Sequence, residues 1–134
     1  MKKLFITCIA LLLLCGCGGK TKTYELQAIR LNQGYQNGEL YSKEAMGMDG
    51  TIIVNESKKT FEIEITMDGE QWAKSVCSYK QDDDYYNLDC ENIKRSVFAN
   101  LNDVAMNLFI ILEEVDPTDM SKNTIGQFVF VEEE

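Results

Sequence analysis

Apolar and polar side chains alternate strictly from Phe61 to Met67, and this feature limits the folds open to the chain more than any other. The apolar side chains lie at positions 61, 63, 65 and 67, and Glu62 and Glu64 lie between them. This two-residue period is typical of a β-strand with one buried face and one solvated face. Because the backbone N–H and C=O groups of the strand need partners, the pattern also requires neighbouring strands.

Six further segments carry strand signals, and turn residues separate many of them. They are residues 24–28, 51–54, 72–79, 85–91, 107–115 and 125–131. Asp49-Gly50 and Asp68-Gly69 mark tight turns, and Asp-Gly is a strong hairpin signal. About seven strands joined mainly by short turns predict a mostly β fold, an antiparallel meander closed or partly closed into a barrel. Closure also removes exposed sheet edges.

Two segments depart from the strand pattern. Residues 42–47 predict one helical turn, with Ser42 capping its start and Gly47 ending it. From Ile93 to Leu108 the apolar residues fall three or four positions apart, which is helical spacing. A helix near 93–105 and a strand there are both open, whereas residues 107–115 are rich in strand formers.

The N-terminus has the three parts of a secretory signal peptide. Lys2 and Lys3 precede an apolar run of about eleven residues, from residue 4 to residue 14, and small residues follow it. The run is too short for a membrane-spanning helix, which needs about 20 residues. Residues 14–17 (Leu-Cys-Gly-Cys) resemble the lipobox of bacterial lipoproteins, with the aliphatic residue, the small residue and Cys17 at the matching positions.

The lipobox resemblance implies that Cys17 becomes the first residue of the mature protein and carries a diacylglycerol, with acyl chains such as palmitate. Two acyl chains give stable attachment, whereas one binds a membrane only marginally. We therefore expect residues 1–16 to be a lipoprotein signal peptide and residues 17–23 to be the lipidated cysteine and a flexible tether. Residues 24–134 should form a single β-rich domain. The protein should be exported and lipid-anchored in the cell membrane or the outer membrane.

The mature chain would be strongly acidic. Removal of residues 1–16 takes away two lysines and no acidic residue, so the net charge changes from −9 to −11 over the remaining 118 residues. We expect no nucleic-acid partner, because phosphate binding depends on Lys and Arg. We also expect anionic lipid headgroups to repel the chain, so that the lipid and not the surface charge holds it at the membrane.

Two of the five cysteines, Cys77 and Cys90, lie in the exported domain, and an even pair there predicts a disulfide. If Asp83 and Asp84 form a two-residue turn, antiparallel pairing places Cys77 directly opposite Cys90. Directly opposed residues can have Cα atoms about 4.5 Å apart, which a disulfide accepts. The alternative is a pair of buried free thiols.

Residues 34–72 contain turn glycines and strand segments in a recognisable order. The matching residues are Gly34, the turn at 45–47, Gly50-Thr51-Ile52, the alternating segment 61–65, Gly69 and Trp72. This order resembles the small lipocalin-like domains found on bacterial lipoproteins. The resemblance implies a lipocalin-like barrel, which is a statement about the fold and not about the function.

The residue types limit the possible chemistry. Histidine is absent, which excludes Ser-His and Cys-His catalysis and histidine-metal sites, and two cysteines do not make a zinc site. We therefore expect no metal and no cofactor. Asp82, Asp83 and Asp84 could contribute to a calcium site, but their spacing is not that of an EF-hand loop, and a solvated hairpin tip is favoured.

Four aromatic residues, Trp72, Tyr79, Tyr85 and Tyr86, are the candidate contact residues for a ligand or a partner. They fall around the same predicted hairpin, and aromatic side chains dominate binding surfaces. Packing between neighbouring strands explains the same cluster.

These features favour a non-catalytic, membrane-anchored lipoprotein: a lipocalin-like module on the cell envelope that binds an unknown small apolar ligand, a peptide or an envelope protein. One alternative is an accessory subunit that docks onto a larger envelope protein complex. A second alternative is a hydrolase that uses carboxylates alone. A barrel filled by its own side chains has no room for a ligand, and such an interior would favour docking.

Overall fold

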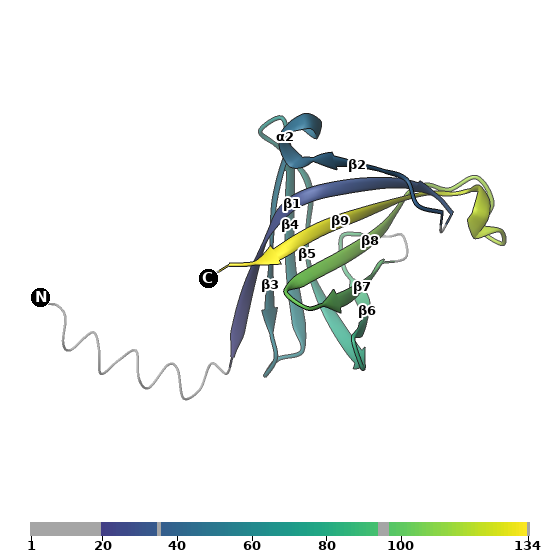
Figure 1. Cartoon of the computed structure of the whole chain (residues 1–134). Helices are drawn as coiled ribbons and strands as arrows, with labels where there is room; N and C mark the ends of the chain where they lie inside the picture. The colour runs from purple at the N-terminus through teal and green to yellow at the C-terminus, as the bar shows by residue number, and fades with distance from the viewer. Residues whose placement is uncertain (1–19, 35, 94–96, 134) are drawn as a thin grey trace, which may run out of the picture.

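The alternating segment of the sequence is strand β4 (Thr60–Met67), which lies inside a β-sheet (Figure 1). The computed structural model describes residues 20–34, 36–93 and 97–133. The other strands are β1 (Thr21–Gln33), β2 (Glu39–Ser42), β3 (Met48–Asn55), β5 (Glu70–Asp82), β6 (Tyr85–Cys90), β7 (Val97–Asn102), β8 (Ala105–Glu113) and β9 (Thr124–Glu132). The seven strands that the sequence predicts are confirmed, most of them with longer bounds, and β2 and β7 are additional.

The first and last strands of the sheet pair with each other and close it into a barrel. β1 and β9 run antiparallel, with a register from Tyr24 opposite Glu132 to Gln33 opposite Thr124. The neighbour order β1-β3-β4-β5-β6-β7-β8-β9 therefore returns to β1, which makes a closed antiparallel barrel of eight strands. β2 lies outside this ring and pairs with residues 28–31 of β1.

Tight turns join most of the strands, as the sequence predicts. The turn predicted at Asp49-Gly50 is wrong, because both residues lie inside β3 and pair with Thr66 and Ile65 of β4. Asp68 and Gly69 both have positive φ angles, 52° and 83°, and this combination is the type I′ geometry that matches the twist of a hairpin. The predicted helical turn is α2 (Lys43–Met46). The Ser42 hydroxyl accepts a hydrogen bond from the Ala45 N–H, and Gly47 ends the helix with a φ of 66°.

The helix considered near 93–105 is wrong for the described residues of that segment. Val97–Asn102 is strand β7, and Asp103 and Val104 turn the chain directly into β8. The helical spacing arose because two short strands with a two-residue turn between them no longer keep a single alternation of apolar residues. Residues 94–96 lie outside the described residues.

The tether predicted at residues 17–23 is shorter in the structure. β1 begins at Thr21 and pairs with β3 from its first residue, Thr21 opposite Asn55. Residues 21–23 therefore belong to the barrel, because the neighbouring strand satisfies their backbone groups. Residues 1–19, which include the predicted signal peptide and Cys17, lie outside the described residues.

The barrel has two ends that differ in their connections. The proximal end is where β1 starts, and it carries the hairpins at residues 56–59, 83–84 and 103–104. The distal end carries α2, the hairpin at residues 68–69 and the longer connection between β8 and β9. In Figure 1 the start of β1 and the tips of β3–β4 and β5–β6 lie at the bottom, and α2 lies at the top.

The barrel interior is the hydrophobic core. Large aromatic and aliphatic side chains point into it and are no more than 2% exposed; they include Tyr24, Leu26, Ile29, Ile52, Phe61, Ile63, Ile65, Met106, Leu108, Phe128 and Phe130. Each such side chain contributes about 1.5–3 kcal/mol when it leaves water. The protein's own side chains therefore occupy the space that a ligand-carrying barrel leaves open.

Candidate functional site

The β5–β6 hairpin is held by a disulfide at the predicted position. Cys77 lies directly opposite Cys90, and the register continues to Asp82 opposite Tyr85, so Asp83 and Asp84 form the turn. The two sulfur atoms are bonded, and the two Cα atoms are 4.1 Å apart. The bond links the neighbouring strands β5 and β6 in the wall of the barrel.

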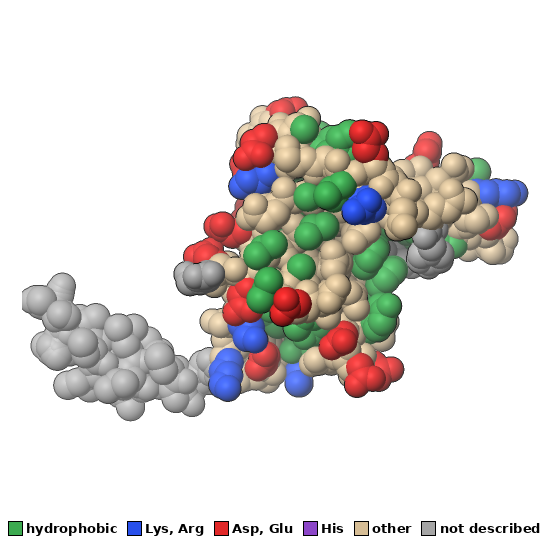
Figure 2. All heavy atoms as spheres, in the orientation of Figure 1, with side chains coloured by type: hydrophobic (Ala, Val, Ile, Leu, Met, Phe, Trp, Pro, Cys, Tyr) green, Lys and Arg blue, Asp and Glu red, His purple; other side chains and the backbone are tan. Residues whose placement is uncertain are grey.

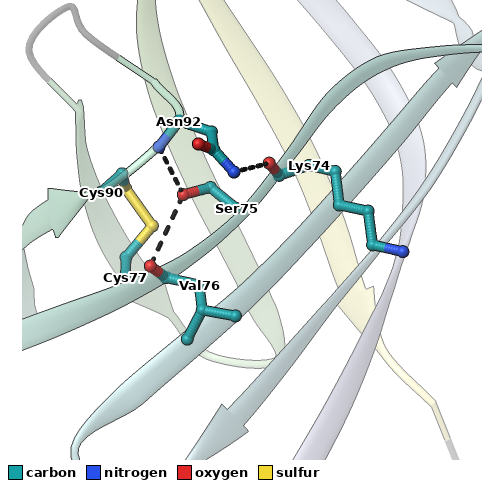
Figure 3. Close-up of a disulfide and its surroundings, with 6 residues drawn as sticks. All are labelled: Lys74, Ser75, Val76, Cys77, Cys90 and Asn92. Carbon is teal, nitrogen blue, oxygen red and sulfur yellow. Dashed lines mark hydrogen bonds between the residues drawn. A yellow bond between two sulfur atoms is a disulfide. The ribbon is translucent and has the colours of Figure 1, made fainter.

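Hydrogen bonds beside the disulfide hold the chain as it leaves β6 (Figure 3). The Ser75 hydroxyl is buried and accepts a hydrogen bond from the Asn92 N–H at 3.2 Å. The Asn92 side-chain amide donates to the Lys74 carbonyl at 3.3 Å. These contacts keep residues 91–93 against β5, so that Ile93 can pack against the core.

Three aromatic rings pack together inside the proximal half of the barrel. The rings of Phe61, Tyr79 and Tyr86 have centroids 5.1–5.2 Å apart, and two of the three pairs are edge-to-face. Such geometry adds about 0.5–1.5 kcal/mol per pair to the energy of burial. Tyr79 and Tyr86 are therefore structural residues of the core, with exposures of 6% and 7%.

Burial changes the acidity of the tyrosines at this end. Burial raises the pKa of Tyr24 to about 12, and the negative charges of Glu132 and Glu56 and the neighbouring Tyr86 add to the shift. The pKa values of Tyr79 and Tyr86 are raised in the same way, first by burial and then by nearby acidic groups that include Glu56. The three phenols stay protonated at neutral pH, so none of the three acts as a general base there.

Trp72 lies at the other end of the barrel, although it is only seven residues from Tyr79 in the sequence. Ile65 pairs with Ala73 and Thr66 pairs with Gln71, so Trp72 is the extra residue of a β-bulge. A bulge redirects the side chain that it adds. The Trp72 ring accordingly lies over the barrel end, with its centroid 5.5 Å from that of the buried Phe128.

A cleft of about 380 Å³ opens beside Trp72 at the distal end. Its walls come from β5, from the segment after β6 and from the end of β8; the residues that line it are Trp72, Ala73, Asn92, Ile93, Ile110, Ile111 and Leu112. Trp72 remains 39% exposed there. A cleft lined mostly by apolar residues, with a partly exposed tryptophan at its side, is the kind of surface on which partners dock.

The four candidate aromatic residues thus do not form one surface. Tyr79 and Tyr86 point into the proximal core, Tyr85 is 54% exposed near the tip of the β5–β6 hairpin, and Trp72 lies in the distal cleft. Sequence reasoning missed Ile93 and residues 110–112 as neighbours of Trp72. A signal was present, since the unbroken apolar run at 108–112 indicates that both faces of this strand are covered.

The arrangement of acidic groups does not add a metal centre within the described residues. Among residues 20–34, 36–93 and 97–133, no group of three or more Cys, Asp or Glu side chains has a geometry that could hold a metal ion. Asp82, Asp83 and Asp84 are exposed at their hairpin, as expected for a solvated tip. In the same part of the chain, no helix is both long enough and apolar enough to cross a bilayer.

The fold and its filled interior define the protein as a small, closed, antiparallel β-barrel. The chain is similar to a solved structure described as the crystal structure of a surface lipoprotein, with a TM-score of 0.52 and 8% sequence identity. The similarity covers 86% of this chain and 62% of the other, so the chain spans less than two thirds of that protein's length. At this identity the likeness concerns the fold. No protein-family model and no curated protein matches the sequence.

Proposed function

We propose that the protein is a lipid-anchored, non-catalytic module of the cell envelope, and that it acts by binding a protein partner through its distal end. The observation that carries this proposal is the filled interior: Tyr24, Phe61, Phe128 and Phe130 are each no more than 2% exposed. A lipocalin that carries a ligand needs an empty lumen. Docking through the outer surface is therefore favoured over ligand carriage.

The lipid anchor rests on the lipobox resemblance at residues 14–17, and the barrel shape that the chain shares with a surface lipoprotein supports it. The position of β1 is also consistent with an anchor. β1 starts only four residues after Cys17, so the lipid would hold the proximal end close to the bilayer and leave the distal cleft pointing away from it.

The anchor can be tested by metabolic labelling with a clickable fatty acid. The wild-type protein should take up the label on its N-terminal peptide, and Cys17→Ser should not. A Cys15→Ser variant is the matched control and should keep the label. Label that persists undiminished in Cys17→Ser would remove the anchor from the proposal.

The docking surface can be tested by photo-crosslinking in the native membrane. A photoreactive amino acid at position 72 samples the distal cleft, and the same amino acid at position 85 samples an exposed aromatic position at the proximal end. We expect position 72 to give a discrete crosslinked envelope protein that position 85 does not give. The 380 Å³ cleft lies in the size range of small-ligand pockets. A small apolar molecule recovered by organic extraction, without any protein adduct, would favour ligand binding at the cleft instead.

A further inference from the structure

Five lysines gather on the proximal end, around the start of β1. They are Lys20, Lys22, Lys58, Lys59 and Lys80, and we call this set the lysine edge. All five are exposed. They come from three neighbouring parts of the fold: β1 and the residue before it, the β3–β4 hairpin, and the end of β5.

Backbone contacts bring these segments together. The Glu56 N–H donates to the Lys20 carbonyl at 3.1 Å, which places Lys20 against the β3–β4 hairpin. Lys22 lies opposite Val54 in the β1–β3 register. The Tyr79 N–H donates to the Lys59 carbonyl at 3.1 Å, and Lys80 is the next residue. Figure 2 shows basic side chains along the lower edge of the molecule, with acidic side chains among them and further along the edge.

The charges of the lysine edge have no ion-pair partner among the described residues. The ion pairs of the described chain use Lys43, Lys74 and Lys122, which lie on the barrel wall and at the distal end. The Lys59 ammonium instead lies over the Tyr79 ring, 5.8 Å from its centroid. The acidic residues of the proximal end belong mostly to other elements; they are Glu56 in the same hairpin, residues 82–84, Asp103, Glu132 and Glu133.

The lysine edge is also the part of the barrel nearest to the predicted lipid. Lys20 follows Cys17 by three residues, which span at most about 11 Å when fully extended. This distance is close to the Debye length of about 8–10 Å at physiological salt, so Lys20 lies within the range over which the headgroup charges act. A lysine near an anionic membrane surface contributes a favourable interaction of its own.

We infer that the lysine edge binds anionic lipid headgroups and sets the orientation of the barrel, with the proximal end on the bilayer and the Trp72 cleft facing away from it. This inference rests on the proposed lipid anchor. It refines the expectation drawn from net charge: the chain as a whole is acidic, and Glu56, residues 82–84 and Glu133 lie beside these lysines, but the five lysines gather next to the predicted lipid.

Amine footprinting of the mature, lipidated protein tests the orientation. The protein is reconstituted in phosphatidylcholine vesicles with and without phosphatidylglycerol and treated with a water-soluble amine-reactive ester, and each lysine is quantified by mass spectrometry. Phosphatidylglycerol should protect Lys20, Lys22, Lys58, Lys59 and Lys80. Lys43, Lys74 and Lys122 serve as internal controls and should react equally in both vesicles. Equal reactivity of these eight lysines in both vesicles would overturn the inference.

A pair of charge-matched variants separates the edge from overall charge. Lys58→Gln/Lys59→Gln should reduce the protection of Lys20, Lys22 and Lys80, by roughly five-fold for each lysine removed. Lys74→Gln/Lys122→Gln has the same net charge and should leave the protection unchanged. An equal loss in both variants would contradict a role for this edge.

The same samples distinguish a failure of the anchor from a failure of the inference. The mass of the N-terminal peptide reports whether Cys17 carries a diacylglycerol. A lipidated protein without protection at the edge would leave the proposed anchor intact and reject the orientation. A protein that carries no lipid but shows selective protection of the edge on anionic vesicles would reject the anchor and retain the lysine edge as a membrane-binding surface.

Discussion

The proximal and distal ends of this barrel use similar residues for different purposes. At the proximal end, the rings of Phe61, Tyr79 and Tyr86 pack against one another, and short hairpins join the strands there. At the distal end, the Trp72 ring packs against Phe128 but remains 39% exposed beside a cleft. The same class of side chain thus stabilises one end of the barrel and leaves a surface available at the other.

This contrast shows that aromatic content alone does not identify a binding surface. Tyr79 and Trp72 both belong to β5, but the bulge at Trp72 changes the direction of its side chain. Burial then decides the role of each residue, because only a partly exposed aromatic ring can gain further contact from a partner.

Truncation of an aromatic side chain should cost far more at the proximal end. Phe61→Ala removes a fully buried ring and should lower the free energy of unfolding by about 4 kcal/mol. Trp72→Ala should cost roughly half as much or less, because its side chain is already partly in water. Urea denaturation followed by far-UV circular dichroism measures both values. Equal costs would show that the distal end is as much a part of the core as the proximal end.

Removal of the disulfide should have the next largest effect. The bond links residues separated by 13 positions, and closing a loop of that size contributes about 3 kcal/mol in the chain-entropy model. Cys77→Ala/Cys90→Ala should therefore lower Tm, and reductant should lower Tm of the wild type but not of the variant. Recovery of both cysteines as alkylated peptides from unreduced wild-type protein would contradict the bridge.

Loss of Asn123 should loosen the distal end and leave the proximal end intact. The Asn123 carboxamide oxygen accepts hydrogen bonds from the Val115 and Asp116 N–H groups at 2.7 and 3.0 Å, and the side chain is 1% exposed. Asn123→Ala leaves these amides unpaired and should cost about 2 kcal/mol.

Hydrogen exchange followed by mass spectrometry locates the effect of Asn123→Ala. Exchange should accelerate in the connection between β8 and β9 and stay unchanged in the β3–β4 hairpin. Ser121→Ala is the control in the same connection, because the Ser121 hydroxyl is exposed and, among the described residues, bonds only to Asp119. Acceleration that spreads evenly over the barrel would show that the two ends unfold together.

The buried phenols should make the proximal end sensitive to alkali. The pKa of Tyr24 is about 12 in the folded protein and 10.0 as its ordinary value. The folded state therefore keeps its proton between pH 10 and pH 12 while the unfolded state loses it, so stability falls as pH rises through this interval.

Tyr24→Phe should weaken this pH dependence without breaking a hydrogen bond, because the Tyr24 hydroxyl has no partner among the described residues. Urea midpoints measured from pH 9 to pH 12 test this, with Tyr41→Phe as an exposed control. An unchanged slope in Tyr24→Phe would assign the alkaline loss of stability to other groups.

Local sequence signals predicted those parts of the fold that local chemistry decides. Ser42 and Gly47 defined α2 because a side-chain acceptor and a left-handed residue are what the ends of a helical turn require. The turn at Asp83 and Asp84 fixed the whole register of its hairpin, including the position of Cys77 opposite Cys90. These outcomes depend on a few neighbouring residues.

The features that sequence reasoning missed depend on distant residues or on an inconspicuous turn. Asp103-Val104 is not one of the common hairpin dipeptides, so β7 and β8 were not separated in advance. The bulge at Trp72 has no marker in the sequence, and it decided which end of the barrel received this side chain. Pairing of β1 with β9 joins segments about a hundred residues apart, which periodicity within one segment cannot reveal. The candidate site was therefore predicted less well than the fold.

The pairing of β1 on both of its edges has a mechanical consequence. β1 starts beside the proposed anchor and is bonded to β3 on one side and to β9 on the other. A partner held at the distal end would pull against the lipid along the direction of this strand. Because antiparallel hydrogen bonds lie perpendicular to the strands, such a tension loads many of them in shear at once and does not peel them apart in sequence. The barrel would therefore resist unfolding under tension and act as a stiff link between anchor and partner.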